Sequence, residues 1–143
     1  MNVLLVEDNP GDVRLTQEAF KVQGSDIELK VAMDGMEALK FLKKEGEFIN
    51  EETPDLILLD LNLPKRDGRE VLTVIKTDEN LRRIPVVILT TSNAEQDILK
   101  SYNLHVNCYI NKPVDFDTFA DIIQKIDEFW LKTAILPPNL QET

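Results

Sequence analysis

The chain has 143 residues, of which 43% are hydrophobic, 26 are acidic and 16 are basic, which gives a formal net charge of −10. This length fits one domain with a buried core, and the acidic balance argues against nucleic acid as a partner, because phosphate backbones are bound by basic patches. Cys108 is the only cysteine, which excludes an intrachain disulfide. The start carries no basic leader, and no apolar run approaches the roughly 20 residues that cross a bilayer. We therefore expect a cytoplasmic protein that does not bind a membrane.

Short apolar segments alternate with amphipathic segments along the whole chain. The predicted order is strand 2–7, helix 11–24, strand 27–32, helix 35–46, strand 56–60, helix 68–81, strand 84–92, helix 93–104, strand 107–111 and helix 115–132. Ser92 or Asn93 is the predicted cap of the fourth helix, and Asp115 that of the fifth. Strand–helix alternation with nearly continuous apolar strands favours an α/β fold with a parallel sheet covered on both faces. Residues 1–131 are predicted to form this domain, and residues 132–143 a C-terminal extension.

Polar side chains follow four of the five predicted strands. Glu7 and Asp8 come after the first, Asp60 after the third, Thr90 at the end of the fourth, and Lys112 after the fifth. Each has an ordinary explanation by itself: a helix N-terminal charge pair, a turn cap, a strand residue or a solvated lysine. Ligands of open parallel sheets bind outside the carboxyl ends of the strands, so the four together favour one shared site.

Three converging carboxylates repel one another, and a hard divalent cation such as Mg²⁺ removes that cost. A nearby ammonium and a hydroxyl supply donors for phosphoryl oxygens. These groups are the components of phosphoryl transfer, and Asp60, on a central strand, is the predicted nucleophile.

The stretches "VLLVEDN", "PDLILLDLNLPKRDG", "IPVVILTTS" and "CYINKP" resemble, in order and spacing, the receiver domain of two-component response regulators. The resemblance covers residues 2–130 and implies a flavodoxin-like (βα)5 fold with strand order 2-1-3-4-5. It also implies the role of each residue at the strand ends: Asp60 is the phosphoacceptor, Asp8 a direct Mg²⁺ ligand, Glu7 a ligand through water, Asn62 a ligand through its main-chain carbonyl, Lys112 and Thr90 the phosphoryl-binding groups, and Thr90 with Tyr109 the switch pair. The family further implies a cis peptide bond between Lys112 and Pro113.

The segments "KKEGEFINEET" and "EFWLKTAILPP" are similar to those of single-domain regulators that pair with phytochrome-type sensors. The implied partner is a sensor histidine kinase, and the implied activity is autocatalytic phosphorylation and dephosphorylation rather than turnover of a free substrate.

Two positions depart from the commonest family pattern. Glu7 replaces a more frequent aspartate, and Thr91 occupies a position where a small residue is common.

No effector module is recognisable after the fifth helix, so we expect the output to be a protein contact. The apolar residues of this helix are predicted to form one core-facing stripe, which consists of Phe116, Phe119, Ile122, Ile123 and Ile126. Phe129 and Trp130 continue the stripe toward the C-terminus. Phe129 and Trp130 either pack on their own domain or form an interface, and both readings stay open. One candidate interface is a homodimer through the fourth helix, fifth strand, fifth helix and C-terminal extension.

Three other classes compete with this interpretation. A haloacid-dehalogenase-type phosphatase also uses a strand-end aspartate, but it requires an acid two positions later, where this chain has Asn62. A flavodoxin would need a phosphate-binding loop after the first strand, where "EDNPGD" places acids instead. A degenerate receiver that acts only as an interaction module usually lacks one of the acidic or lysine positions, and all are present here.

Overall fold

Five parallel strands form one sheet in the order β2-β1-β3-β4-β5, which is the order that the resemblance to receiver domains implies. The structure is a computed structural model that describes residues 1–22, 26–113 and 115–138. The strands are β1 (Asn2–Val6), β2 (Glu28–Ala32), β3 (Leu56–Leu59), β4 (Val86–Thr90) and β5 (Cys108–Asn111). The parallel sheet predicted from the alternation of elements is therefore confirmed, and it has the flavodoxin-like doubly wound form that the resemblance to receiver domains implies.

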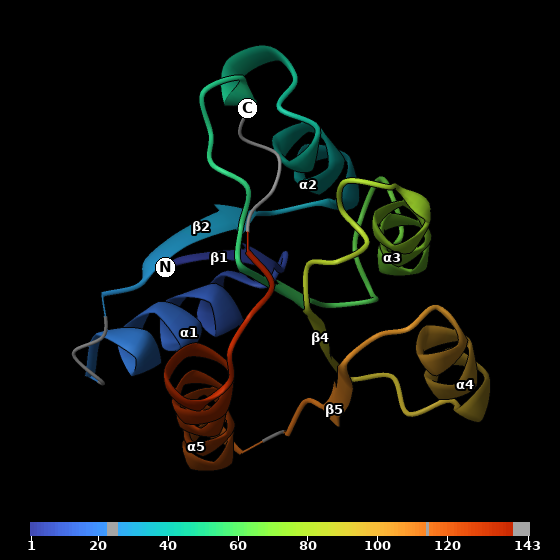
Figure 1. The fold of residues 1–143 in the computed structure, drawn as a ribbon. Helices are drawn as coiled ribbons and strands as arrows, with labels where there is room; N and C mark the ends of the chain where they lie inside the picture. The colour runs from blue at the N-terminus through green and yellow to red at the C-terminus, as the bar shows by residue number, and fades with distance from the viewer. Residues whose placement is uncertain (23–25, 114, 139–143) are drawn as a thin grey trace.

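Helices cover both faces of this sheet (Figure 1). Helices α1 (Pro10–Val22) and α5 (Phe116–Ile126) lie on one face, and α2 (Gly35–Leu42), α3 (Gly68–Thr77) and α4 (Glu95–Asn103) lie on the other. A short 3-10 helix, η1 (Gly46–Phe48), follows α2, and a π-helix, η2 (Asp127–Thr133), continues α5. No helix among the described residues is long and apolar enough to cross a membrane.

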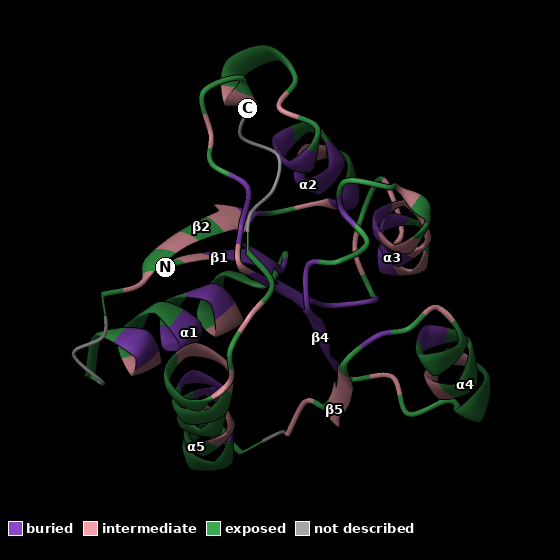
Figure 2. Cartoon of the chain, in the orientation of Figure 1, coloured by how far each residue is buried: buried purple, intermediate pink, exposed green. Residues whose placement is uncertain are grey.

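The three central strands are buried on both faces because their side chains alternate between two apolar layers (Figure 2). One layer packs beneath α2 and α3 and receives from the strands Leu4, Val6, Ile57, Leu59, Val86 and Ile88. The other packs beneath α1 and α5 and receives Val3, Leu5, Leu56, Leu58, Val87 and Leu89. This continuous apolar character leaves the ends of the central strands as the places where charged groups can occur.

Two local predictions are wrong. Helix α4 begins after Ala94, which makes no side-chain cap, and the Ser92 hydroxyl instead donates to Asp97 Oδ2 at 2.7 Å. Phe116 is 67% exposed rather than part of the core, because it is the first residue of α5 and precedes the part of the helix that lies on the sheet. The predicted cap of α5 is confirmed, since Asp115 accepts from the main-chain N–H of Thr118.

Candidate functional site

The strand register brings the predicted site residues to one level at the carboxyl edge of the sheet. Val6 pairs with Leu59, so Glu7 and Asp60 emerge side by side. Thr90 pairs with Asn111, which places Lys112 one residue beyond the end of β4. Main-chain hydrogen bonds extend the pairing past the strands, from Asp60 N to Val6 O at 3.1 Å and from Lys112 N to Thr90 O at 2.6 Å. The backbone at the strand ends is therefore fixed rather than loosely attached.

Three carboxylates converge at this edge. Glu7, Asp8 and Asp60 each offer an oxygen, and these oxygens lie within 4.8 Å of one another. Glu7 and Asp60 are 3% and 6% exposed, whereas Asp8 is exposed. A set of carboxylate oxygens with one open side is the ligand type that a hard divalent cation prefers, since such ions keep part of their water shell. The cluster thus fits a divalent metal, as the sequence predicts.

Lys112 lies among these acids with its side chain only 6% exposed. Its ammonium contacts Glu7 Oε1 at 2.5 Å, Asp12 Oδ2 at 2.9 Å and Asp60 Oδ2 at 3.1 Å. Asp12 was not predicted as a site residue. It belongs to the first turn of α1, and only the direction in which that helix leaves the sheet brings its carboxylate to the lysine.

The charges of this cluster do not cancel. Burial lowers the pKa of Lys112, but hydrogen bonds to Glu7 and Asp12 outweigh it and leave the pKa above its usual value. Burial raises the pKa of Glu7 to about 7, although Lys112 opposes this shift, and the charge of Asp60 adds to it. The Lys112 ammonium is paired with the three carboxylates of Glu7, Asp12 and Asp60, so an excess of negative charge remains. A bound divalent cation would neutralise this excess.

Asn62 connects the end of β3 with the end of β4. Its main-chain N–H donates to Asp60 Oδ1 at 3.0 Å. Its side-chain amide lies 3.2 Å from the Thr91 hydroxyl and 3.5 Å from the Thr90 hydroxyl. Thr90 is fully buried, whereas Asn62 and Thr91 are exposed. One residue, Asn62, therefore contacts both the predicted nucleophile Asp60 and the predicted phosphoryl-binding hydroxyl of Thr90.

Gly68 allows the loop after β3 to lie close beneath the start of α3. A Cβ atom at this position would lie 2.3 Å from Asp60 O and 2.5 Å from Leu61 Cα, which is closer than real Cβ contacts. The Gly68 N–H donates to Leu61 O at 3.0 Å. Only glycine permits this approach, so Gly68 helps to fix the backbone that carries Asp60.

Tyr109 and the β4–α4 loop are linked by a second polar network. The Tyr109 hydroxyl donates to Ser92 O at 2.9 Å. Asp97, in the first turn of α4, accepts from both the Ser92 hydroxyl and the Arg69 guanidinium, each at 2.7 Å. The Arg69 hydrogen bonds are the main cause that lowers the pKa of Asp97 to about 2. Neither Arg69 nor Asp97 was predicted from the sequence, because nothing in the local pattern distinguishes them from surface charges.

The expected cis bond before Pro113 is not observed. No cis peptide bond occurs within the described part of the chain, so Lys112–Pro113 is trans. The trans isomer is the favoured one for a bond that precedes proline.

Phe129 and Trp130 have different environments. Trp130 is half-buried and packs against the apolar layer beneath α1 and α5, whereas Phe129 is 54% exposed. Their rings meet edge to face with centroids 5.3 Å apart. Trp130 thus packs on its own domain, whereas Phe129 lies at the surface, where it is available for an interface.

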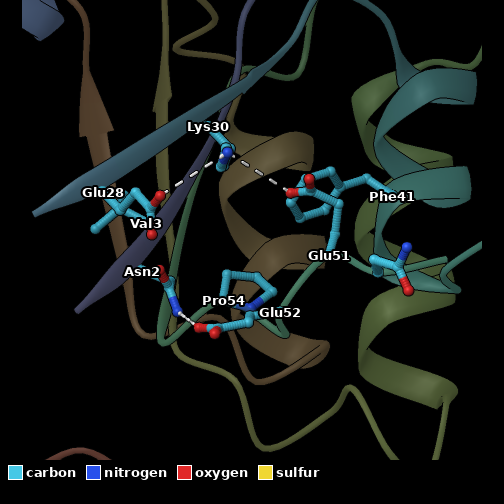
Figure 3. Close-up of a pocket in the computed structure, with 9 residues that line it drawn as sticks. Asn2, Val3, Glu28, Lys30, Phe41, Glu51, Glu52 and Pro54 are labelled. Carbon is cyan, nitrogen blue, oxygen red and sulfur yellow. Dashed lines mark hydrogen bonds and ion pairs between the residues drawn. The ribbon is translucent and has the colours of Figure 1, made fainter. Parts of the chain in front are cut away.

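A small cavity of about 170 Å³ lies at the opposite, amino edge of the sheet (Figure 3). Lys30 approaches Glu28 and Glu51 only to 4.0 Å, and the side-chain amide of Asn2 donates to Glu52 at 2.6 Å. None of the predicted site residues lines it. The chemistry predicted from the sequence therefore belongs to the carboxyl edge.

Comparison with known proteins agrees with this geometry. Residues 3–124 match the family described as response regulator receiver domain. Response regulator Rcp1 of Synechocystis sp. is 52% identical over 135 residues, which cover 94% of this chain and 92% of that protein. The structure of the phosphorylated cyanobacterial phytochrome response regulator RcpA superposes with a TM-score of 0.93 at 55% identity, covering 96% of this chain and 98% of that one. The Mn²⁺-bound form of Rcp1 superposes with a TM-score of 0.93 at 51% identity, covering 96% and 99%.

These relatives confirm the resemblance to phytochrome-associated response regulators and give no support to the phosphatase alternative. A divalent cation bound to Rcp1 also agrees with the acidic cluster of Glu7, Asp8 and Asp60.

Proposed function

The chain belongs to the response regulator receiver domain family of two-component signalling, and we propose that Asp60 is the residue that accepts the phosphoryl group. The observation that carries this proposal is the position of Asp60. It ends a central strand, is buried, contacts Lys112 at 3.1 Å and shares its edge with the oxygens of Glu7 and Asp8. The proposed donor is a phosphohistidine of a sensor histidine kinase. RcpA is a phytochrome response regulator, which supports a phytochrome-like kinase as the partner.

The transfer forms a bond between an Asp60 carboxylate oxygen and phosphorus and breaks the bond between phosphorus and the histidine nitrogen. The product is an acyl phosphate, and hydrolysis by water restores the carboxylate. Lys112 already aims an N–H at Asp60, so its charge is in place before the phosphoryl oxygens arrive.

Glu7, Asp8, Asp60 and the main-chain carbonyl of Asn62 are the proposed ligands of Mg²⁺, with Glu7 acting through water. When bound, the ion supplies positive charge to the carboxylates and the phosphoryl oxygens. The excess negative charge around Lys112 supports this assignment, because Lys112 is the one cation that forms ion pairs with these acids among the described residues.

The test is incubation with acetyl phosphate, with and without Mg²⁺, followed by mass spectrometry of the intact protein. The wild type is expected to gain one phosphoryl group in the presence of Mg²⁺, and Asp60→Asn none. Asp55→Asn is the matched control, because Asp55 precedes the same strand at its amino end and accepts from Asn2 N. Stoichiometric labelling of Asp60→Asn would refute the assignment. Absence of labelling in the wild type would favour the degenerate receiver.

Thr90 and Tyr109 are the proposed switch. In this structure Tyr109 donates to Ser92 O, so the loop after β4 and the tyrosine are connected. A hydrogen bond from Thr90 to a phosphoryl oxygen would shift the population toward a state with this loop drawn inward. Thr90→Ala should be labelled like the wild type, yet beryllofluoride should change amide hydrogen exchange in residues 91–103 less than in the wild type. An equal change in both proteins would contradict this switch.

We also propose that the protein acts in the cytoplasm through a protein contact, without nucleic acid, and that the candidate interface is a homodimer through α4, β5, α5 and the extension 132–143. Residues 139–143 of this extension lie outside the described residues. The exposed ring of Phe129, on the π-helix η2 that continues α5, supports an apolar contact. Phe129→Ala should weaken dimerisation in sedimentation equilibrium, whereas Val22→Ala, at an exposed apolar residue on α1, should not. Unchanged sedimentation of Phe129→Ala would remove Phe129 from the interface.

A further inference from the structure

We infer that Asp12 is a positioning residue that orients the Lys112 ammonium toward Asp60, an inference that rests on the proposed function of Asp60. An ammonium group has three N–H donors and no acceptor. The Lys112 ammonium meets three carboxylates, one at the end of β1, one in the first turn of α1 and one at the end of β3. The ammonium donates to Glu7 and Asp60 and forms an ion pair with Asp12 at 2.9 Å, so its direction toward Asp60 depends on both other carboxylates.

The burial of Lys112 makes this arrangement important. With only 6% of its side chain exposed, the ammonium depends on protein acceptors rather than on water for its donors. Without the Asp12 carboxylate, the ammonium would lose one of its three acidic partners and could rotate or withdraw from Asp60. Glu7 cannot fix the orientation alone, because a single hydrogen bond leaves free rotation about its axis.

The backbone at Asp12 is itself held in place. Asn9 Oδ1 accepts from the main-chain N–H groups of Gly11 and Asp12 at 2.9 and 3.2 Å, and Asn9 N donates to Glu7 Oε2 at 3.2 Å. Thr16 donates to Asp12 O at 2.7 Å. This start of α1 ties Asp12 to the same strand end that carries Glu7. The carboxylate is therefore preorganised toward the lysine before any phosphodonor binds.

A phosphorylated Asp60 would keep the same arrangement. The donor now directed at Asp60 is the one nearest to new phosphoryl oxygens, while Glu7 and Asp12 retain the other two. The opposing hypothesis is that Asp12 acts only as one more negative charge and repels the phosphodonor. The two hypotheses predict opposite effects when the carboxylate is removed, so they can be separated.

The experiment compares the rate of labelling by acetyl phosphate with Mg²⁺ in Asp12→Ala, Asp12→Asn and the wild type. Positioning predicts a rate about tenfold lower for Asp12→Ala and recovery of most of the rate in Asp12→Asn, which keeps an acceptor oxygen at the same place. Repulsion predicts that both variants equal or exceed the wild type, and that result would overturn the inference. Asp117→Ala is the control, since Asp117 is also an acid in the first turn of a helix but lies on α5.

A second comparison excludes a merely structural effect. In a Lys112→Met background, Asp12→Ala should no longer slow the labelling, because the residue acts through the lysine. A tenfold loss that persists in this background would overturn the inference. The serine side chain of Asp12→Ser is too short to reach the lysine, so this variant should behave like Asp12→Ala. If Asp12→Ala does not fold, Asp12→Ser takes its place in both comparisons. Failure of the wild type to be labelled at Asp60 would refute the proposed function, whereas normal labelling of Asp12→Ala would refute only the role of Asp12.

Discussion

The two edges of the sheet both gather acids around a lysine, but they differ in distance and burial. At the carboxyl edge the Lys112 side chain is 6% exposed, and its nitrogen lies 2.9 Å from Asp12 and 3.1 Å from Asp60. At the amino edge Lys30 is 44% exposed and approaches Glu28 and Glu51 only to 4.0 Å (Figure 3). Residue types alone therefore do not distinguish a buried charge cluster from a solvated surface.

The difference arises from what covers each edge. At the carboxyl edge, Asp12 on helix α1 and Asp60 after β3 flank the buried Lys112 side chain, so these charges interact with little screening by water. Exposed pairs such as those of Lys30 contribute little, because water solvates both partners.

Lys76 shows what burial does without acids. Its ammonium donates to the main-chain carbonyls of Arg82 and Ile84 at 3.1 and 2.9 Å, and no described carboxylate lies within ion-pair distance. Burial lowers its pKa to about 8. The carboxylates around Lys112 therefore keep that lysine charged, whereas burial favours the neutral form of Lys76.

The largest effect is expected for Lys112→Met. Removing the cation that contacts Asp60 should slow labelling by acetyl phosphate by about 100-fold, because no other basic side chain of the described residues forms an ion pair with Asp60. Lys30→Met is the control at the amino edge and should be labelled at the wild-type rate. Circular dichroism checks that both variants are folded. Equal labelling of the two variants would remove the functional contrast between the edges.

Gly68→Ala tests the backbone that closes the carboxyl edge. The added methyl group would overlap Asp60 O and Leu61 Cα, so the loop must move, at a cost of about 1–3 kcal/mol in the free energy of unfolding. We also expect slower labelling of Asp60, because its carboxylate moves with the loop. Urea unfolding and the labelling assay measure the two effects. Glu70→Ala, at an exposed position of α3, should change neither, and wild-type stability of Gly68→Ala would contradict the packing argument.

Lys76→Met tests whether burial of a lysine that has no described carboxylate nearby lowers its pKa, which appears in the pH dependence of the free energy of unfolding. The pKa is about 8 in the folded chain and about 10.5 for an ordinary lysine, so the unfolded chain binds more protons between these values. The free energy of unfolding of the wild type should therefore rise with pH across this window, and Lys76 should contribute up to about 3 kcal/mol to that rise. The contribution should vanish in Lys76→Met and persist in Lys125→Met, an exposed control. Identical pH profiles for the wild type and Lys76→Met would show that Lys76 titrates normally.

The smallest effect is expected for Lys30→Met on stability. Its two contacts are long and exposed, so the free energy of unfolding should change by less than about 0.5 kcal/mol. Guanidinium unfolding at low and high salt measures this change. A loss above 1 kcal/mol that disappears at high salt would mean that the amino edge is also an effective electrostatic cluster.

Most of the fold and much of the candidate site could be predicted, because both depend on patterns that are local in the chain. Apolar runs of strand length locate β1, β3 and β4, and the polar residue after each run locates Glu7, Asp60 and Thr90. The predicted cap of α4 is wrong because the helix begins at Glu95, after Ala94, and the Ser92 hydroxyl donates to the Asp97 carboxylate rather than capping the helix. The exposure of Phe116 likewise depends on where α5 meets the sheet.

The sequence by itself determined the order of the elements, the parallel sheet and the carboxylates at its edge, because hydrophobic periodicity and strand-end chemistry are properties of neighbouring residues. Only the tertiary structure decided that Asp12 reaches Lys112, that Arg69 holds Asp97, and that Trp130 packs on its own domain while Phe129 remains exposed. These contacts join residues from different elements, and their distances depend on how the helices dock onto the sheet.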